Sequence, residues 1–456
     1  MGWVFNLPVA LWRRLLLIGQ GLGALVLLLG GAIGALFGGE GTIASRLGAV
    51  LGSPSGQRRL FAVARLLQPN AVLPFKLITC YENDGTALAT RRADVLNILS
   101  RDADFGVVYG PRMEIITGGE NFFLGMQDTP RYTRDVSNMR LVVRRSDVPS
   151  IVAPAVAACA SAIVGAAPGA IDVPQQLATP VAAHLLDRYF GTPGPSEADM
   201  AEWTTTLFRY LFLDLKGDAA FDATAEAAAA AFRTWMDGHI AARKAAPAQD
   251  DVLDDVLGRC LVMDAAGLPG MHDMDVRNNL IGLLIGELPT LSATATLALD
   301  ELLDRPEALA GAMAAARSDD DTALAAYVFE ALRFRPLNPV VYRRALHDTR
   351  IAAGRLRGRR IKAGTMVLAS NLSAMFDPLD VPTPGRFRID RPWETYLLWG
   401  YGLHSCFGAH INRATIPGIL KPLLARPGLR RAPGAAGRID TGGTPFPIHL
   451  HVVFDQ

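Results

Sequence analysis

Apolar positions recur at helical spacing over most of the chain beyond about residue 56. Alanine-rich amphipathic runs, separated by Pro/Gly loops, predict helices over residues 153–164, 219–243, 299–316 and 321–334. A further apolar helix is expected from Asn278 to about Leu303. The pattern therefore indicates a mainly α fold with a small β region.

Strand-like patterns are short and few. β-branched or apolar runs at residues 340–343 and 365–368 flank a basic turn and predict a small sheet or hairpin, and residues 442–454 alternate as a strand pair would. We find no internal repeat and no linker long enough to divide the chain. Residues 51–456 are therefore expected to form one large domain.

The N-terminal segment is strongly apolar. Residues 15–39 hold no charged side chain and one polar side chain, Gln20. As a helix this stretch would be roughly 37 Å long, enough to cross a bilayer, and it exceeds the apolar region of a cleavable signal peptide. We expect residues 1–50 to be a membrane anchor, or an apolar helix that lies on a membrane or packs on the protein. Two G-x-x-x-G pairs permit close helix packing in lipid: Gly19 with Gly23, and Gly30 with Gly34.

Composition excludes several classes of protein. The chain is 50% hydrophobic and 20% charged, which excludes a disordered protein. Lys and Arg number 45 against 44 Asp and Glu, so no basic excess indicates a nucleic-acid partner. The cysteines at 80, 159, 260 and 406 form no C-x-x-C, the spacing of zinc knuckles and iron–sulfur sites. The chemistry must lie in another motif.

Residues 399–408 read Trp-Gly-Tyr-Gly-Leu-His-Ser-Cys-Phe-Gly. This stretch resembles the haem-binding loop of the cytochrome P450 family, F-G-x-G-x-H-x-C-x-G, with Trp in place of the first Phe. A cysteine thiolate on haem iron favours O–O cleavage, and glycines let the backbone approach the sulfur. A helix expected over residues 409–424 would favour negative charge at its N-terminus. The resemblance implies haem b with Cys406 as axial ligand, and a P450-like fold; the loop residues expected to bind the cofactor are Trp399, Gly400, Gly402, His404, Phe407 and Gly408.

Two further motifs match the family in the expected order. Glu330 and Arg333 form an E-x-x-R on a predicted helix, where positions three apart share a face. Arg386 lies in a P-x-R-F segment. The resemblance implies that these three charges form a buried structural cluster that retains haem and takes no part in the chemistry.

The central helix departs from the family pattern. Registering on Pro306-Glu307 places Thr290 at the family's distal threonine and Pro289 at the usual acid. Three alternatives remain open. Glu287, three residues before Thr290, can serve as the relay acid; or the oxidant is a peroxide that needs no delivered proton; or Glu287 only caps backbone groups freed by the proline or meets water.

The haem propionates lack one family partner. Asp128–Arg134 resembles the family's D-P-P-E-H-T-R stretch, but the propionate-binding Arg would fall at Val136. The resemblance instead assigns His404 and Arg343, with the neighbouring Arg344 as an alternative to Arg343. Arg134 is a weaker candidate, and for Arg343 an exposed strand-end arginine is the plain alternative.

Other features carry weaker expectations. A basic cluster in a presumed hairpin can dock an acidic redox partner or anionic lipid, although a solvated turn is the simpler interpretation; it comprises Arg355, Arg357, Arg359, Arg360 and Lys362. Substrate contacts are expected, by family analogy, from Phe105, Met113, Phe122 and the turn at residues 445–447. His449 and His451 alternate on a strand with no third ligand nearby in sequence, so we expect no metal site there.

The resemblance implies an oxidoreductase. The first hypothesis is a monooxygenase that hydroxylates or epoxidises a small lipophilic substrate with O₂ and a separate ferredoxin or flavoprotein reductase, since the chain lacks a G-x-G-x-x-G nucleotide unit. The second is a peroxygenase, isomerase or lyase that uses peroxide or lipid hydroperoxides. The third is a non-catalytic haem carrier or sensor. The Ala/Arg-rich composition suggests a bacterial source, hence a membrane-associated protein at the cytoplasmic membrane with its haem domain in the cytoplasm.

Overall fold

The computed structural model describes residues 3–38, 41–246 and 254–455. Within them the chain forms two compact units, each built from segments far apart in sequence. The first, here the sheet unit, comprises Met1–Ile78, Glu82–Gly106 and Arg333–Ser405. The second, here the helical unit, comprises Thr79–Tyr81, Val107–Leu332 and Cys406–Gln456.

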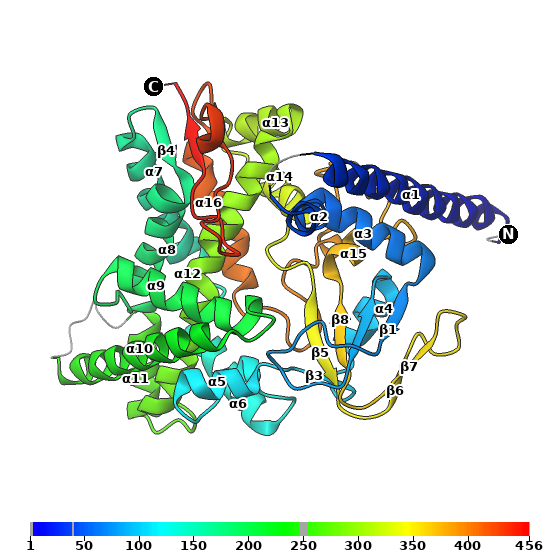
Figure 1. Cartoon of the computed structure of the whole chain (residues 1–456). Coiled ribbons are helices and arrows are strands. Elements are labelled where there is room, and N and C mark those ends of the chain that lie inside the picture. Colours follow the sequence, from blue (N-terminus) through cyan, green and yellow to red (C-terminus); the bar gives the residue numbers. More distant parts are fainter. Residues whose placement is uncertain (1–2, 39–40, 247–253, 456) are drawn as a thin grey trace. The chain divides into compact units, whose positions relative to one another are not determined.

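The sheet unit is built around a five-stranded sheet (Figure 1). Its strands, in spatial order, are β1 (Asn70–Leu73), β2 (Thr86–Ala89), β8 (Met366–Ala369), β5 (Val341–Ala345) and β3 (Phe105–Gly106). β2 and β8 are parallel, and the other neighbours are antiparallel. All four residues of β8 are buried, as expected of a central strand. The strands expected from residues 340–343 and 365–368 are therefore present, as antiparallel neighbours.

The basic turn between these strands forms its own hairpin. β6 (Thr349–Ile351) pairs with β7 (Arg359–Ile361) in an antiparallel ribbon. Two short helices, α4 (Arg92–Leu99) and α15 (Asn371–Met375), belong to the same unit. Their apolar faces join the strands in one core, to which Val95, Leu99, Phe105, Val367 and Leu372 contribute.

Three helices at the N-terminus pack on one another within the sheet unit. The long α1 (Trp3–Phe37) lies against α2 (Ile43–Gly52) and α3 (Pro54–Leu67) (Figure 1). Among the described residues, the contact is made through Gly21, where a Cβ would press on Leu66, and Gly31, where it would lie 3.1 Å from Val50. The glycines of the two expected G-x-x-x-G pairs instead face open space, with nothing within 4 Å.

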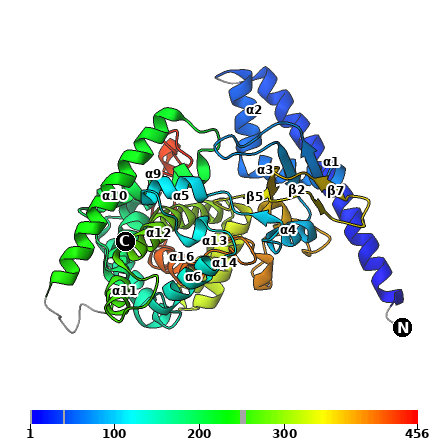
Figure 2. The same cartoon turned by 90° about the horizontal axis from the view of Figure 1, so that it is seen from below.

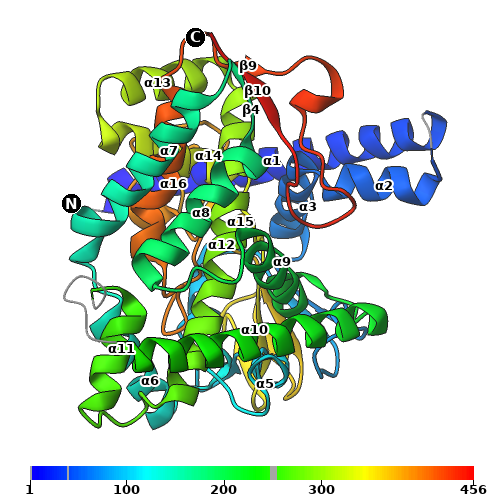
Figure 3. The same cartoon turned by 90° about the vertical axis from the view of Figure 1, so that its left-hand side faces the viewer.

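The helical unit holds most of the helices (Figure 3). They are α5 (Gly110–Thr117), α6 (Pro130–Val142), α7 (Ala153–Ala166), α8 (Thr179–Leu185), α9 (Glu197–Phe208), α10 (Ala219–Ala245), α11 (Val256–Ala265), α12 (Asp273–Leu303), α13 (Pro306–Arg317), α14 (Asp321–Phe334) and α16 (Ala409–Leu424). The last turn of α14 passes into the sheet unit. The predicted mainly α fold with a small β region is thus confirmed.

α12 is the central helix of this unit. It contacts α8, α9, α10 and α16, and α10 also runs beside α9 (Figure 2). Its apolar residues face these neighbours on most sides, which explains why the sequence shows a nearly continuous apolar run rather than a single stripe.

One expected helix is divided in the structure. The predicted run over residues 299–316 forms the end of α12 and the whole of α13, with a break at Asp304 and Arg305. Pro306 causes the break, because a proline has no N–H to continue a helix but is well accommodated in a first turn.

A second, three-stranded sheet lies in the helical unit. Its order is β4 (Ala170–Asp172), β10 (His451–Val453) and β9 (Arg430–Arg431), all antiparallel. The strand pair expected within residues 442–454 is reduced to one isolated bridge, Asp440 to His449. β10 instead pairs with strands from elsewhere in the chain, a long-range choice that periodicity cannot reveal.

Three helical segments are long and apolar enough to cross a membrane, judged by length and composition of the described residues: Val9–Phe37, Val148–Ala166 and Asp273–Leu303. The third is α12, whose most apolar window is 72% buried inside the protein. We therefore treat α12 as a core helix. Of the first, only 17% of the corresponding window is buried.

Candidate functional site

An accessible stripe runs along the middle of the otherwise buried α12. Its members recur every three or four residues and are the less buried positions Leu283, Gly286, Thr290, Thr294 and Leu297. At 100° per residue they all fall within about 80° of the helix circumference. One face of α12 thus borders open space while the others pack into the core. The predicted catalytic residues lie on or beside this face.

Glu287 lies at the edge of the stripe, about 60° around the helix from Thr290. Its side chain is buried, and neither carboxyl oxygen has a hydrogen-bond partner among the described residues. Burial raises its pKa from the ordinary 4.5 to about 8, so the carboxyl is protonated at neutral pH. It does not cap backbone groups near Pro289, so that alternative for Glu287 is not supported.

Thr290 and Pro289 shape the backbone at this point. The Thr290 hydroxyl donates to the carbonyl of Gly286, with Oγ1 and O 2.6 Å apart. Pro289 supplies no N–H, so the usual donor to the carbonyl of Ile285 is missing. The helix nevertheless continues through Pro289 to Leu303. The stripe therefore carries a hydroxyl and altered backbone bonding beside a protonated carboxyl.

Cys406, the predicted axial ligand of haem, also lies in the helical unit. It precedes α16, and the N–H groups of Gly408 and Ala409 point at its sulfur. Removal from water raises the pKa of the Cys406 thiol, while these amides and the Arg140 guanidinium act in the opposite direction. At Gly408 the position of an added Cβ would be 4.0 Å from the sulfur, in ordinary contact. The loop thus offers the sulfur to a partner with its donors already arranged.

Arg140 is a residue that sequence reasoning missed. It projects from the last turn of α6, its Nη1 donates to the Phe407 carbonyl at 2.9 Å, and its guanidinium lies 3.6 Å from the centre of the Phe407 ring. Phe123 packs on the same ring at 5.2 Å between centroids. Nothing in the sequence near Arg140 marks it, because its role depends on α6 lying next to the start of α16.

The preceding part of the loop belongs to the sheet unit. Gly400 and Gly402 have φ values of +73° and +77°, where glycine is favoured, and a Cβ on Gly402 would overlap the Leu99 carbonyl. Trp399 stacks on Trp393 at 5.5 Å. These two glycines are therefore needed for the turn itself.

His404 and Arg343, the expected propionate partners, lie near each other in the sheet unit. The His404 side chain is buried, with Nε2 3.8 Å from Asp102, and burial followed by the charge of Arg343 lowers its pKa to about 4. Arg343 is also buried and donates to the Tyr342 carbonyl at 2.8 Å. The alternative of an exposed strand-end arginine is therefore wrong for Arg343.

The alternative candidates are engaged elsewhere. Arg344 forms an ion pair with Glu82 at 3.5 Å. Arg134 pairs with Asp135 at 2.7 Å within the helical unit. Neither arrangement supports a propionate role.

The structural charge cluster is only partly as expected. Glu330 and Arg333 are completely buried on α14, and Arg333 donates to the carbonyls of Met375 and Arg386, each at 3.2 Å. Arg386, however, is an exposed residue that meets Arg333 through its main-chain oxygen. The expectation that the Arg386 guanidinium joins the buried charges is wrong, since a backbone carbonyl takes that place without desolvating a further charge.

The expected substrate-facing residues are buried in the described chain. Phe105 lies in the core of the sheet unit, and Met113 is equally inaccessible in the helical unit. Phe122 packs on Gly282 of α12, where a Cβ would overlap its ring. In the turn at residues 445–447, Phe446 is buried against Phe208 at 5.8 Å. Phe122, next to the helix that carries the stripe, stays the strongest of these candidates.

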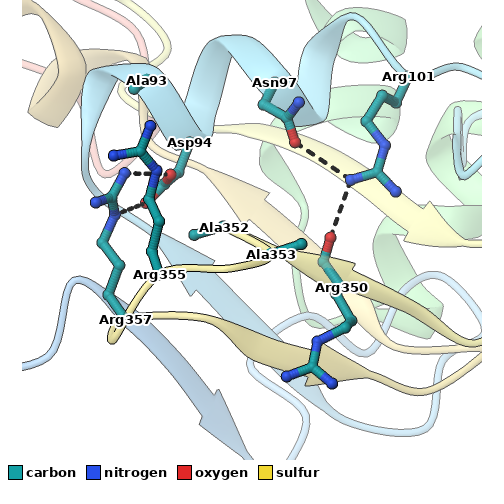
Figure 4. Close-up of a pocket in the computed structure, with 9 residues that line it drawn as sticks. All are labelled: Ala93, Asp94, Asn97, Arg101, Arg350, Ala352, Ala353, Arg355 and Arg357. Atoms are coloured by element: carbon teal, nitrogen blue, oxygen red, sulfur yellow. Dashed lines mark hydrogen bonds and ion pairs between the residues drawn. The ribbon is translucent and has the colours of Figure 1, made fainter.

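The basic cluster borders a polar pocket of about 400 Å³ in the sheet unit (Figure 4). Arg357 donates twice to Asp94, at 2.6 and 2.8 Å, and Arg101 donates to Asn97 and to the Arg350 carbonyl. None of the predicted haem or catalytic residues lines this pocket. Arginines that line the pocket therefore hold the β6–β7 hairpin against α4 and its C-terminal end. This agrees with the interpretation of the basic cluster as a simple surface turn.

The expectation that His449 and His451 lack a third ligand is wrong. β4 pairs with β10 and brings Asp172 to both imidazoles, so a third ligand-bearing residue is present. The sequence could not show it, because Asp172 lies in a segment nearly 280 residues earlier.

Comparison with known proteins decides the family. The family model described as Cytochrome P450 matches residues 220–426, which include the α12 stripe and the Cys406 loop. Over this segment the chain matches the cytochrome P450 family. The crystal structure of CalO2 has the same fold, with a TM-score of 0.71 at 20% identity over 89% of this chain and 97% of that one. The predicted P450-like fold is thereby confirmed.

Curated proteins similar to this chain fall into two groups. Cyclomarin C epoxidase CymV of Salinispora arenicola is 26% identical over 341 residues, covering 73% of this chain and 80% of the relative. Linoleate diol synthase of Gaeumannomyces graminis is 36% identical over 98 residues, covering 22% of this chain and 8% of the relative. The matches to the first curated relatives thus span a tenth or less of those proteins' length.

The residues of this chain fit a haem group. The family implies haem with a cysteine thiolate ligand, and the chain presents Cys406 with two amides at its sulfur. The accessible stripe on α12 gives a flat group room in the same unit. In the sheet unit, Arg343 and the neutral His404 offer N–H donors for carboxylates.

Proposed function

We propose that this P450 enzyme is a monooxygenase that hydroxylates or epoxidises a small lipophilic substrate, using O₂ and electrons from a separate ferredoxin or flavoprotein reductase. The observation that carries the proposal is the protonated, buried carboxyl of Glu287 beside the accessible stripe of α12. A monooxygenase that reduces O₂ must deliver protons into a site closed to bulk water. Glu287 is positioned and protonated for that task.

Bound haem would supply an iron centre whose thiolate ligand promotes O–O cleavage. Cys406 would hold that iron, with the amides of Gly408 and Ala409 moderating the charge on its sulfur. His404 and Arg343 would hold the propionates through N–H donors. The chain's contribution on this side is to orient the cofactor.

Protons would pass from the Glu287 carboxyl to the stripe. The Thr290 hydroxyl donates to the Gly286 carbonyl, so its oxygen can still accept a hydrogen bond from a proton donor. With a pKa of about 8, Glu287 holds its proton at neutral pH, and a pKa this close to neutral lets the group both lose and regain a proton. Pro289, which cannot titrate, leaves Glu287 as the acid on this part of α12.

A lipophilic substrate is supported by the apolar surroundings of the stripe, which include Leu283, Leu297 and the nearby Phe122. The relative CymV is named as an epoxidase, and this supports oxygen insertion as the class of reaction. An accessible α12 face also favours an enzyme over a closed haem carrier.

A hydroperoxide-using enzyme is the second candidate. Two observations favour it: Pro289 stands where the family's acid would be, and parts of the chain are similar to linoleate diol synthase, over 22% of the chain, and to a bifunctional dioxygenase–epoxy alcohol synthase, over 46%. In that reaction the substrate carries its own O–O bond, and no reductase is needed. Glu287 would then protonate the departing oxygen.

One experiment separates the two candidates. Purified ferric protein is mixed with a polyunsaturated fatty-acid hydroperoxide, with no electron donor, while diene absorbance and products are followed; Cys406→Ala is the control. A parallel reaction contains the parent fatty acid, O₂, NADPH and a surrogate ferredoxin with its reductase. Product only in the second reaction supports the monooxygenase. Rapid Cys406-dependent turnover in the first overturns it in favour of the hydroperoxide enzyme.

We also propose that α1 attaches the enzyme to a membrane while lying along its own unit. One side of α1 is held by α3, and Arg13 donates to the Leu379 carbonyl at 2.9 Å. The other sides expose large apolar side chains, among them Trp12, Leu22 and Val26. Such a helix is suited to burial in the lipid interface without crossing it.

A further inference from the structure

Two strands from distant parts of the chain gather three metal-binding side chains in the helical unit. The β4–β10 register sets Asp172 directly opposite His451. His449 lies two residues before His451, and side chains two apart along a strand share a face. The sheet thus presents one carboxylate and two imidazoles on the same side.

The distances bring these groups within reach of one ion. Nδ1 of His449 lies 2.6 Å from Oδ2 of Asp172, and Nε2 of His451 lies 3.7 Å from the same oxygen. The three ligand atoms all lie within 4.8 Å of one another. The two imidazole rings are nearly parallel, at 12°, with centroids 6.1 Å apart.

The carboxylate is fixed by groups behind it. The Asp172 side chain is buried, and its Oδ1 accepts the Leu450 N–H at 3.0 Å. The N–H of Asp172 itself donates to Gln176 at 2.8 Å. Oδ2 is therefore the oxygen presented to the imidazoles, an outer-shell arrangement typical of metal-ligating carboxylates.

The two histidines are accessible. Each side chain is 45% exposed, so an ion can enter from solvent and keep water as a further ligand. In tetrahedral Zn²⁺ coordination, ligand atoms are about 3.3 Å apart. Small rotations of the two half-exposed rings would lengthen the His449–Asp172 distance from 2.6 Å and shorten the His451–Asp172 distance from 3.7 Å to reach this value.

A simple strand-fastening hydrogen bond explains only part of this arrangement. The His449–Asp172 pair accounts for one imidazole. His451, at 3.7 Å from the carboxylate, is too distant to hydrogen-bond it and yet is aligned beside His449. Two imidazoles converging on a fixed carboxylate are the donor set that Zn²⁺ and related ions prefer.

We propose that Asp172, His449 and His451 bind one first-row transition-metal ion, and that the ion bound in the cell is Zn²⁺. The ion replaces the proton between His449 and Asp172 and joins β10 to β4. Because Phe446, three residues before His449, packs on Phe208 at the end of α9, the ion also fixes this segment against α9. Its role is to hold this segment in place, separate from the haem chemistry.

Zn²⁺ itself is the probe. The haem-loaded full chain is treated with EDTA, dialysed and titrated with ZnCl₂ by isothermal titration calorimetry. We expect one saturable site per chain, and affinity at least tenfold weaker in each of Asp172→Asn, His449→Ala and His451→Ala. The matched control is His347→Ala, because His347 pairs with Asp104 at 2.6 Å and is exposed but has no second imidazole. It should bind Zn²⁺ as the parent does.

A second measurement guards against a variant that merely misfolds. The haem absorbance spectrum should match the parent for both histidine variants, and the Tm without metal should match it for His451→Ala, whose half-exposed side chain lies 3.7 Å from Asp172. Zn²⁺ should raise the Tm of the parent and of His347→Ala, and leave that of His451→Ala unchanged. Absence of one-to-one binding overturns the proposal. So does binding that survives the double variant His449→Ala/His451→Ala, or that His347→Ala removes equally.

Discussion

At the scale of single residues, the burial of Glu287 creates an electrostatic conflict in the described core. A carboxyl without a partner in a buried position is costly when ionised, so it keeps its proton. Stability alone would favour an apolar residue here. The neighbouring Thr290, whose hydroxyl also borders the stripe, makes a catalytic explanation the more economical one.

Glu287→Gln tests the proton donor directly, because it keeps the shape and removes the acid. General acids contribute about 10²–10⁴-fold to rate, so we expect kcat to fall by about 10²-fold while substrate binding changes little. In the parent, kcat should decline as pH rises through about 8, where Glu287 loses its proton. The variant should lack this limb. An unchanged pH profile in the variant would exclude Glu287 as the donor.

The same residue predicts how stability depends on pH. The folded-state pKa of about 8 lies above the ordinary 4.5, so between these values the folded protein holds a proton that the unfolded chain has released. Stability should therefore fall as pH rises through this window, by up to about 1.4 kcal/mol per pH unit from this group. Thermal unfolding at pH 5 and pH 8 should show a smaller decrease in Tm for Glu287→Gln than for the parent.

Arg343 and Arg344 form a natural pair of neighbours for testing cofactor retention. Arg343 is buried near His404, whereas Arg344 pairs with Glu82. We expect Arg343→Ala to weaken haem binding by roughly tenfold, through the loss of about 1.5 kcal/mol or more of charge-assisted bonding. Arg344→Ala should retain haem as the parent does. Haem transfer to apomyoglobin measures the rate of haem loss from each variant. Equal rates in the two variants would contradict the assignment of Arg343 as a propionate partner.

At the scale of elements, α12 combines a packed face and an accessible face. Gly282 lets α12 approach Phe122, while Gly286 has nothing within 4 Å of where its Cβ would be. Two chemically identical residues one turn apart thus serve different ends. Their difference reports which face of α12 packs and which borders the site.

Gly282→Ala and Gly286→Ala separate these faces. The first places a methyl group into the Phe122 ring, so we expect a loss of about 1–3 kcal/mol in stability. The second should keep stability or gain up to about 1 kcal/mol, because alanine is the better helix former. Since its methyl group projects into the accessible stripe, Gly286→Ala should alter substrate turnover. Denaturant unfolding and product analysis check the pair, and equal destabilisation would contradict this account of α12.

At the scale of the whole molecule, the described chain consists of two units, and the cysteine loop is divided between them. Ser405 ends the last segment of the sheet unit, and Cys406 begins the last segment of the helical unit. The sheet unit carries α1, of whose most apolar window 17% is buried, and the helical unit carries the apolar segment Val148–Ala166, of whose window 22% is buried. We propose α1 as the membrane attachment because its exposed side chains include the large apolar residues Trp12, Leu22 and Val26.

Charge placed on the outer side of α1 tests attachment without removing the helix. Leu22 and Val26 are exposed, so Leu22→Glu with Val26→Glu should leave the packing at Gly21 intact. We expect the double variant to lose most of its binding to phospholipid vesicles in a flotation assay, with haem content and Tm unchanged. A control replaces Leu356, which is exposed in the distant-in-sequence β6–β7 hairpin, with Glu. Undiminished flotation of the double variant would exclude α1 as the attachment.

The sequence by itself determined whatever depends on local pattern. Amphipathic periodicity located α7, α10 and α14, and the spacing around Cys406 identified the cofactor loop, because both are properties of neighbouring residues. Only the tertiary structure decided what depends on distant partners. It placed Arg140 beside Phe407 and substituted a carbonyl for the Arg386 guanidinium. It also brought Asp172 to His449 and His451. These contacts join segments whose pairing is set by packing of the whole chain, and a single sequence records no such distance.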